Sequence, residues 1–132
     1  MAVSININTK SRSDMIDITA AVAEEVLKSG ISEGICTIYV PHTTAGITIN
    51  EGADPAVCRD ILHSLEKLVP PGAGYRHMEG NADSHIKTSI MGSSVSILVE
   101  KSRLLLGTWQ KIFFCEFDGP RSRKFHMKVL GR

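Results

Sequence analysis

The segment Arg76–Lys87 concentrates side chains that could do chemistry. It holds two histidines, two carboxylates, an asparagine and two cationic residues within twelve positions. Neutral imidazole is a common ligand for zinc and other late transition metals, and carboxylates serve as general acids or bases. A segment that only connects two core elements has no need of so many such groups. We therefore expect the rest of the chain to present this segment and to bring other polar residues to it.

Three of the five histidines, His42, His77 and His85, are candidate metal ligands. His77 and His85 are separated by seven residues across an expected loop-to-helix turn, so both could converge on one point. His63 falls on the polar face of an expected helix and His126 on the wet face of an expected strand, so neither receives a role. A site of three histidines with one open position is a known catalytic arrangement for zinc. The alternative, in which His77 and His85 only form hydrogen bonds within a turn, stays open.

Four charged residues are candidates for catalysis: Glu51, Glu79, Asp83 and Lys87. Each carboxylate could act as a general acid or base, orient a histidine or bind Mg²⁺. Lys87 could stabilise negative charge on a leaving group. A structural explanation competes for Asp83, because a negative charge in the first turn of a helix is favourable without any function. The cofactor we expect is a divalent metal ion, Zn²⁺ or Mg²⁺.

Composition limits the class of protein. The 132 residues are 42% apolar and 22% charged, which is typical of one domain, and we expect residues 1–132 to form it. A formal charge of +1 argues against nucleic-acid binding. Three widely spaced cysteines fit neither a disulfide framework nor a metal motif and favour a reducing cytoplasm. No apolar run reaches the roughly 20 residues that span a bilayer, so we expect no membrane partner.

Apolar periodicity predicts strands and helices in alternation along the chain. Helices are expected from Thr19 to Gly30, from Pro55 to Leu68 with Asp54 as N-cap, and from Ala82 to near Gly92 with Asn81 as N-cap. In the last of these, Ala82, Ile86 and Ile90 are expected to form the apolar stripe. Strands are expected at 3–8, 16–18, 34–40, 47–50, 95–99, 104–106, 111–117 and 124–129. Six to eight short strands with two or three helices indicate a compact α+β domain.

One residue in the expected strand 111–117 conflicts with its neighbours. Glu116 shares a strand face with Ile112 and Phe114. If that face points inward, the carboxylate needs a partner, because an unpaired buried charge is costly.

Four motifs, in this order along the chain, closely resemble the YjbQ family, also labelled the uncharacterised family UPF0047. They are the runs PHTTAGITINE (41–51), HMEGNADSHIK (77–87), LGTWQ (106–110) and EFDGPR (116–121). The resemblance extends over nearly the whole chain. It implies a single α+β domain with β-sandwich-like antiparallel sheets, assembled as a homotrimer.

The resemblance also implies an activity. Members are associated with a secondary thiamine phosphate synthase activity, which joins a hydroxymethylpyrimidine pyrophosphate to a thiazole phosphate and releases pyrophosphate. We therefore expect a small phosphorylated substrate, with Lys87 or Arg121 near the leaving group. Two alternatives stay open: a non-catalytic homotrimer that binds a metal or a small anion, and a metal-assisted hydrolase that uses a site of His42, His77 and His85.

Overall fold

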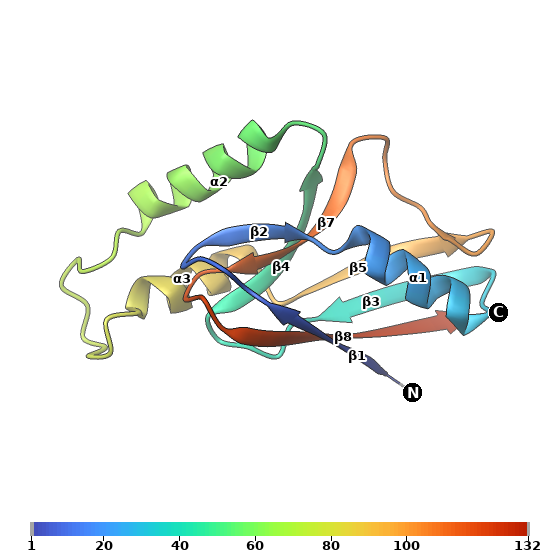
Figure 1. Cartoon of the computed structure of the whole chain (residues 1–132), viewed down its shortest axis with the longest axis horizontal. Coiled ribbons are helices and arrows are strands. Elements are labelled where there is room, and N and C mark those ends of the chain that lie inside the picture. The colour runs from blue at the N-terminus through green and yellow to red at the C-terminus, as the bar shows by residue number, and fades with distance from the viewer. Residues whose placement is uncertain (1, 132) are drawn as a thin grey trace.

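The chain folds into two antiparallel sheets and three helices, in a computed structural model that describes residues 2–131. In chain order the elements are β1 (Val3–Asn8), β2 (Asp14–Asp17), α1 (Thr19–Ser29), β3 (Glu33–Tyr39), β4 (Ala45–Glu51), α2 (Pro55–Leu68), α3 (Ala82–Met91), β5 (Ser94–Glu100), β6 (Arg103–Leu104), β7 (Gln110–Glu116) and β8 (Ser122–Gly131). Figure 1 shows α1 and α3 towards opposite ends of the molecule, with both termini near the α1 end.

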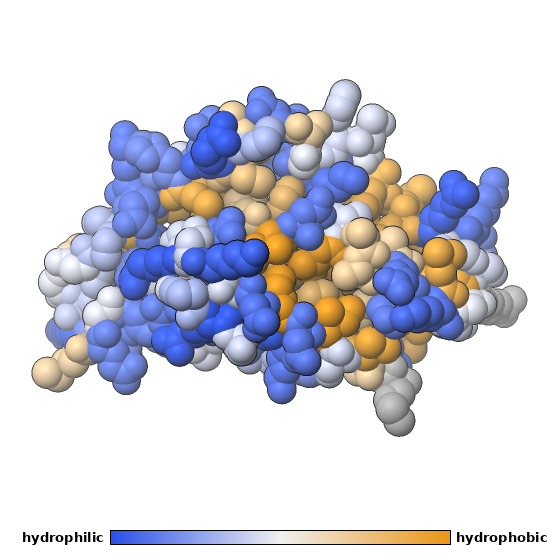
Figure 2. Space-filling view, viewed as in Figure 1, coloured by the Kyte–Doolittle hydropathy of each residue, from blue (hydrophilic) through white to orange (hydrophobic). Residues whose placement is uncertain are grey.

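The two sheets pack face to face as a sandwich. The larger sheet has the strand order β1-β8-β3-β5-β6 and the smaller has β2-β7-β4. Ile38, Ile97 and Phe125 of the larger sheet share one buried cluster with Ile47 and Phe114 of the smaller sheet. The α+β architecture with sandwich-like antiparallel sheets is thereby confirmed. Figure 2 shows apolar residues gathered in the middle of the face where the strands cross, with polar residues around them.

Strand β7 is buried on both of its faces. Ile112 and Phe114 point into the sandwich, while Phe113 and Cys115 belong to a second apolar cluster that includes Leu65 of α2. Helix α2 therefore covers the outer face of the smaller sheet, which makes a third layer. A strand covered on both sides needs apolar residues at every position, which explains the continuous run IFFC at 112–115.

Two helix ends were predicted correctly from the sequence. The Asp54 carboxylate accepts a hydrogen bond from the Ala56 amide at 2.9 Å, and Gly30 ends α1 with a left-handed φ of 71°. Both are the capping interactions that these residue types favour.

The prediction for the buried face of α3 was wrong for two of its three residues. Ala82 is buried as expected, but Ile86 and Ile90 are 38% and 54% exposed, whereas Asp83, Ser84 and Lys87 are buried. The interior accepts these polar side chains because each one has a partner: Asp83 and Lys87 pair with each other, and the Ser84 hydroxyl donates to the Phe117 carbonyl. The helix was correctly located, but the apolar stripe did not indicate which side faces the protein.

A close approach between two glycines places the end of α3 against β4. The Ile47 amide donates to the Gly92 carbonyl at 3.1 Å, and a Cβ on Gly46 would lie 2.5 Å from the same oxygen. Only glycine at position 46 permits this contact. It brings the residues before β4, including His42, next to the C-terminal turn of α3.

No helix within residues 2–131 has both the length and the apolar character needed to cross a membrane. Cys36, Cys58 and Cys115 are free thiols.

Candidate functional site

The side chain of Asn81 connects His77 to the protein interior. Its amide nitrogen donates to Asp118 Oδ2 at 2.8 Å, and its Oδ1 lies 2.9 Å from His77 Nε2. A carboxylate only accepts hydrogen bonds, so the orientation of the Asn81 amide is fixed and Oδ1 must accept a proton from His77. His77 therefore carries its proton on Nε2 and leaves Nδ1 free to accept a hydrogen bond or bind a metal. We expected Asn81 to cap α3, but its side chain makes no capping hydrogen bond.

His77 and His85 meet, as their spacing predicted. Their ring centroids are 5.1 Å apart, with the planes at 77°. His77 is 40% exposed and lies in the loop before α3, while His85 is half-buried on the first full turn of that helix. The hydrogen bond between His77 and Asn81 also matches the alternative in which these residues only stabilise a turn.

His42 approaches the same region from the other side. A pocket of about 380 Å³ separates it from α3, lined by His42, Thr43, His85, Thr88, Ser89, Gly92 and Ser93. Nε2 of His42 accepts a hydrogen bond from the Lys124 amide at 3.0 Å. Burial and the positive charge of Arg123 lower the pKa of His42, so its ring is neutral near pH 7 with the proton on Nδ1. His42 would have to give up the amide contact before Nε2 could bind a metal.

A buried ion pair holds the loop that carries His42. Arg123 and Glu116 are 7% and 0% exposed and are joined by two hydrogen bonds of 2.6 and 2.8 Å. The Arg123 guanidinium also donates to the hydroxyl and the carbonyl of Thr44. Glu116 accepts further hydrogen bonds from the Thr9 hydroxyl and the Asp118 amide. The partner that Glu116 required is therefore Arg123, and the pair fixes both the residues after His42 and the start of the turn that contains Asp118.

The Asp118 carboxylate forms ion pairs with two arginines close to the histidines. Arg121 lies 3.0 Å and Arg12 lies 3.5 Å from its carboxylate, and Arg12 also reaches Asp83 at 3.1 Å. Burial tends to raise the pKa of Asp118, but the hydrogen bonds from Asn81 and Arg121 outweigh it and hold the pKa below its ordinary value. Arg12 and Arg121 remain 46% and 54% exposed, so both guanidinium groups are accessible to an anion.

The four candidate catalytic residues do not lie together in the structure. Glu79 is 78% exposed and lies 3.9 Å from His77 Nε2, so it belongs to the site. Asp83 and Lys87 are buried and paired at 2.9 Å, and Lys87 also contacts Glu66 at 2.6 Å. These partners give Asp83 and Lys87 a structural role behind the site, and a catalytic role for them stays a prediction.

Glu51 lies far from the histidines along β4. In the antiparallel pairing of β4 with β7, Glu51 lies opposite Gln110, whereas Ala45, at the other end of β4, lies opposite Glu116. Each strand residue advances about 3.3 Å, so the two ends of β4 are about 20 Å apart. The sequence separation of Glu51 from His42 is small, but an extended strand carries the carboxylate away from the site.

The three histidines of the expected metal site do not converge on one point within the described residues. Among residues 2–131, no three histidine, cysteine or carboxylate side chains converge closely enough to hold a metal ion. His77 has a free Nδ1, and its Nε2–H donates to Asn81, which is the arrangement that orients histidine ligands in metalloproteins. A metal ion at His77 and His85 therefore stays a prediction, and His42 Nε2 is occupied by the Lys124 amide.

Residues missing from the sequence interpretation complete the site. Arg12, Asp118 and Thr88 were not selected, because they lie far from one another in sequence or have ordinary structural explanations. Arg123 was not selected either. Glu116 was the one available signal in the sequence. A carboxylate on a buried strand face requires a cation, so it predicts that one lies nearby.

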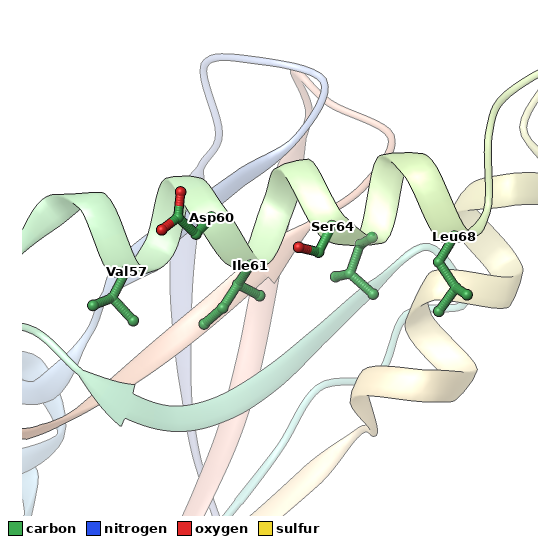
Figure 3. Close-up of a pocket in the computed structure, with 6 residues that line it drawn as sticks. Val57, Asp60, Ile61, Ser64 and Leu68 are labelled. Carbon is green, nitrogen blue, oxygen red and sulfur yellow. The ribbon is translucent and has the colours of Figure 1, made fainter.

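A second hollow lies along α2 and has a different character. Its volume is about 420 Å³, and Val57, Ile61 and Leu68 point from the helix towards the neighbouring strands and α3 (Figure 3). Asp60 is the one charged residue in its lining and points away from the apolar side chains. Apart from Asp60 and Ser64, the residues that line it are apolar.

The fold and the site together define a small sandwich protein of two antiparallel sheets with a pair of histidines at the start of α3. The chain belongs to the UPF0047 protein YjbQ-like family, whose model matches residues 3–132. It is 49% identical to UPF0047 protein MJ1081 of Methanocaldococcus jannaschii, over 99% of this chain and 95% of that protein. It is also 49% identical to UPF0047 protein YugU of Bacillus subtilis, over 99% of this chain and all of that protein.

Solved structures support the same assignment. The crystal structure of an uncharacterized YjbQ/UPF0047 protein from Clostridium acetobutylicum superposes with a TM-score of 0.96 at 51% identity, covering 97% of this chain and 99% of that one. A hypothetical protein from Aeropyrum pernix gives a TM-score of 0.95 at 38% identity, covering all of this chain and 99% of that one. These similarities support the family and the fold.

Proposed function

We propose that the protein is an enzyme with secondary thiamine phosphate synthase-like activity. It would join a hydroxymethylpyrimidine pyrophosphate to a thiazole phosphate and release pyrophosphate. The observation that carries the proposal is the grouping of two accessible arginines with two histidines around Asp118 and Asn81. The support for this particular reaction comes from the resemblance to the family, and the support for a phosphorylated substrate comes from the arginines.

The chemistry requires stabilisation of negative charge. When pyrophosphate leaves, it takes the electron pair of the broken carbon–oxygen bond, so charge develops on its oxygens. Arg12 and Arg121 are suited to this role because their planar guanidinium groups bind phosphate oxygens in pairs. Asp118 holds both side chains in place while leaving each about half exposed. The thiazole ring nitrogen forms the new carbon–nitrogen bond and gains a positive charge without losing a proton, so Glu79, beside His77, would act there through its negative charge.

A divalent metal ion is part of the proposal. It would bind His77 through Nδ1 together with His85, and it would supply a Lewis acid next to the leaving group. Imidazole ligands favour Zn²⁺ over Mg²⁺, which prefers oxygen. The remaining ligands would come from the substrate, from His42 after release of the Lys124 amide, or from a partner copy in a homotrimer.

The test is turnover by purified protein with both precursors and either Mg²⁺ or Zn²⁺. We expect His77→Ala and His85→Ala to lower turnover by more than roughly 100-fold, because each removes a metal ligand, and loss of a group that only orients a ligand already costs up to about 100-fold. His63→Ala is the matched control, because His63 is an exposed histidine on α2. Unchanged turnover in both site variants would remove the histidines from the mechanism.

A second candidate function is binding of a metal ion or small anion without catalysis. The observation that favours it is the 2.9 Å contact of His77 Nε2 with Asn81 Oδ1, which would leave Nδ1 for a metal whether or not a reaction follows. Elemental analysis of protein purified without a histidine tag distinguishes the cases: stoichiometric metal with no turnover supports binding alone. Turnover of a simple phosphoester, lost in the same histidine variants, would instead indicate a metal-assisted hydrolase.

The homotrimer is supported by the apolar side of α2. Leu68, at the C-terminal end of α2, is 70% exposed, and burial of such an apolar side chain against another copy of the chain is favourable. Light scattering tests the assembly. A mass near the 14.4 kDa of one chain would contradict it.

A further inference from the structure

Four charged side chains form a row that leads from the candidate site to α2. Arg12 Nη2 donates to Asp83 Oδ1 at 3.1 Å, and the other oxygen of Asp83 accepts a hydrogen bond from Lys87 Nζ at 2.9 Å. Lys87 Nζ also donates to Glu66 Oε2 at 2.6 Å. Glu66 belongs to α2, while Asp83 and Lys87 belong to α3, so the row joins both helices to the half-exposed guanidinium of Arg12.

The middle of this row is buried and its ends are not. The side chains of Asp83 and Lys87 are 1% and 2% exposed, whereas those of Arg12 and Glu66 are 46% and 50% exposed. A buried ion pair is weak evidence for stability, because apolar residues of similar volume often replace one without loss. Charges out of water are screened little, so they act on other charges several ångströms away. An electrostatic effect on the site is therefore the better explanation for a lysine at position 87.

The charges at the site cancel without Lys87. Arg12 lies near two carboxylates, Asp83 at 3.1 Å and Asp118 at 3.5 Å. Asp118 also pairs with Arg121 at 3.0 Å. Two arginines and two carboxylates have no net charge, so by themselves they would attract an anion weakly. Lys87 adds one positive charge directly behind Asp83 and offsets it, which leaves the charge of Arg12 available to an anion.

Glu66 acts in the opposite direction. Its carboxylate lies 2.6 Å from Lys87 Nζ, at the end of the row away from Arg12, and it offsets part of the positive charge that Lys87 supplies. Because Glu66 is half exposed, water screens its charge and the offset is incomplete. The positive charge of the site is thus raised by Lys87 and lowered by a residue of α2.

We propose that Lys87 is a positioning residue for anion binding, which acts through Asp83 to keep Arg12 available, and that Glu66 opposes it and so lets α2 set the affinity of the site. The proposal rests on the proposed function, in which phosphate oxygens of the substrate lie at Arg12 and Arg121. Lys87 does not touch the anion, since its ammonium group is buried between Asp83 and Glu66.

The two partners of one ion pair should change anion affinity in opposite directions. Inorganic pyrophosphate is the probe, and calorimetry at low ionic strength measures its Kd. We expect Lys87→Met to raise the Kd by about fivefold and Glu66→Gln to lower it by about twofold, the effects of a unit charge at roughly 10 Å in a partly aqueous medium. A merely structural role predicts weaker binding in both variants, because each breaks the same contact. Both effects should shrink as salt is added, since salt screens charges at this distance.

Lys28 and Glu24 of α1 are the matched controls. They form an exposed ion pair of 3.3 Å with the same spacing along a helix as Asp83 and Lys87, and α1 lies towards the opposite end of the molecule from α3 (Figure 1). Lys28→Met and Glu24→Gln change the net charge of the protein by the same amounts as the two site variants and should leave the Kd unchanged. Lys87→Met leaves the buried Asp83 with one cation, so circular dichroism checks its fold. Glu66→Gln removes only a half-exposed charge, so it tests the proposal by itself.

Equal or weaker pyrophosphate binding in Glu66→Gln would overturn the proposal, as would equal or tighter binding in folded Lys87→Met. So would a wild-type protein that binds no pyrophosphate. Turnover of the two precursors is measured separately. Opposite shifts in Kd without turnover would overturn the proposed reaction and retain the role of Lys87. Turnover with unshifted Kd values would overturn the role of Lys87 and retain the reaction.

Discussion

Arg123→Met tests whether the buried ion pair holds the site together. Arg123 is the cationic partner of Glu116, which is fully buried, and it also binds Thr44. Removing one member of a buried pair costs about 3–5 kcal/mol, because the other charge is left without compensation. Glu116 would keep its hydrogen bonds from Thr9 and the Asp118 amide, so we expect about 3 kcal/mol, at the low end. For a domain of this size that loss corresponds to a fall in Tm of about 10–15 °C.

The loss should depend on pH in a defined direction. Burial tends to raise the pKa of Glu116, but hydrogen bonds from Arg123, the Asp118 amide and Thr9 outweigh it and lower the pKa below the ordinary value of 4.5. In the wild type, ionised Glu116 therefore contributes stability above its ordinary pKa, and the contribution is lost as pH falls through the lowered value. Without Arg123, burial dominates and the pKa rises, so the variant gains stability as Glu116 becomes protonated. The deficit should thus be largest near pH 7 and shrink towards pH 4.

Urea unfolding of both proteins at pH 7 and pH 4 measures this difference. Arg121→Met is the control, because Arg121 pairs with Asp118 at a half-exposed position, where an ion pair contributes less than about 1 kcal/mol. A deficit below 1 kcal/mol for Arg123→Met at pH 7, or one that does not shrink at pH 4, would refute the reasoning.

Two further outcomes follow from single contacts. Asn81→Leu removes the hydrogen-bond acceptor that fixes the proton of His77 on Nε2. We therefore expect the Zn²⁺ affinity, measured in a competition titration, to fall by roughly 10-fold to 100-fold. An unchanged affinity would show that Asn81 does not orient His77. Burial raises the pKa of Cys36 to about 11 and that of Cys115 to about 12, so at pH 8 a thiol reagent should modify at most the partly exposed Cys58 in the folded protein. Rapid modification of all three thiols before unfolding would contradict this.

The sequence predicted the elements well because their signals are local. Alternation at residues 3–8 located β1 at Val3–Asn8, and Asp54–Pro55 marked the start of α2. The motifs at 41–51 and 77–87 correctly indicated the family. The proximity of His77 and His85 could be predicted from the sequence because only one turn separates the loop of His77 from the helix of His85. Few backbone conformations of so short a segment keep the two rings apart.

Polar residues in the interior could not be placed in this way. The exposed Ile86 and Ile90 were expected to be buried, and the buried Asp83 and Lys87 were expected at the site. Periodicity records where apolar side chains recur along a helix, but the charges inside are stabilised by partners that are distant in the chain. Lys87, for example, meets Glu66 of α2 only after both helices have packed.

The sequence by itself therefore determined the element types, the family and the segment that carries the histidines. The tertiary structure decided which residues share the site: it brought Arg12, Asp118 and Arg123 to the segment and carried Glu51 away. The physical reason is the range of each interaction. Hydrogen bonds within helices and turns depend on neighbours a few residues apart, whereas ion pairs such as Arg123 with Glu116 form only when the sheets and helices close around them.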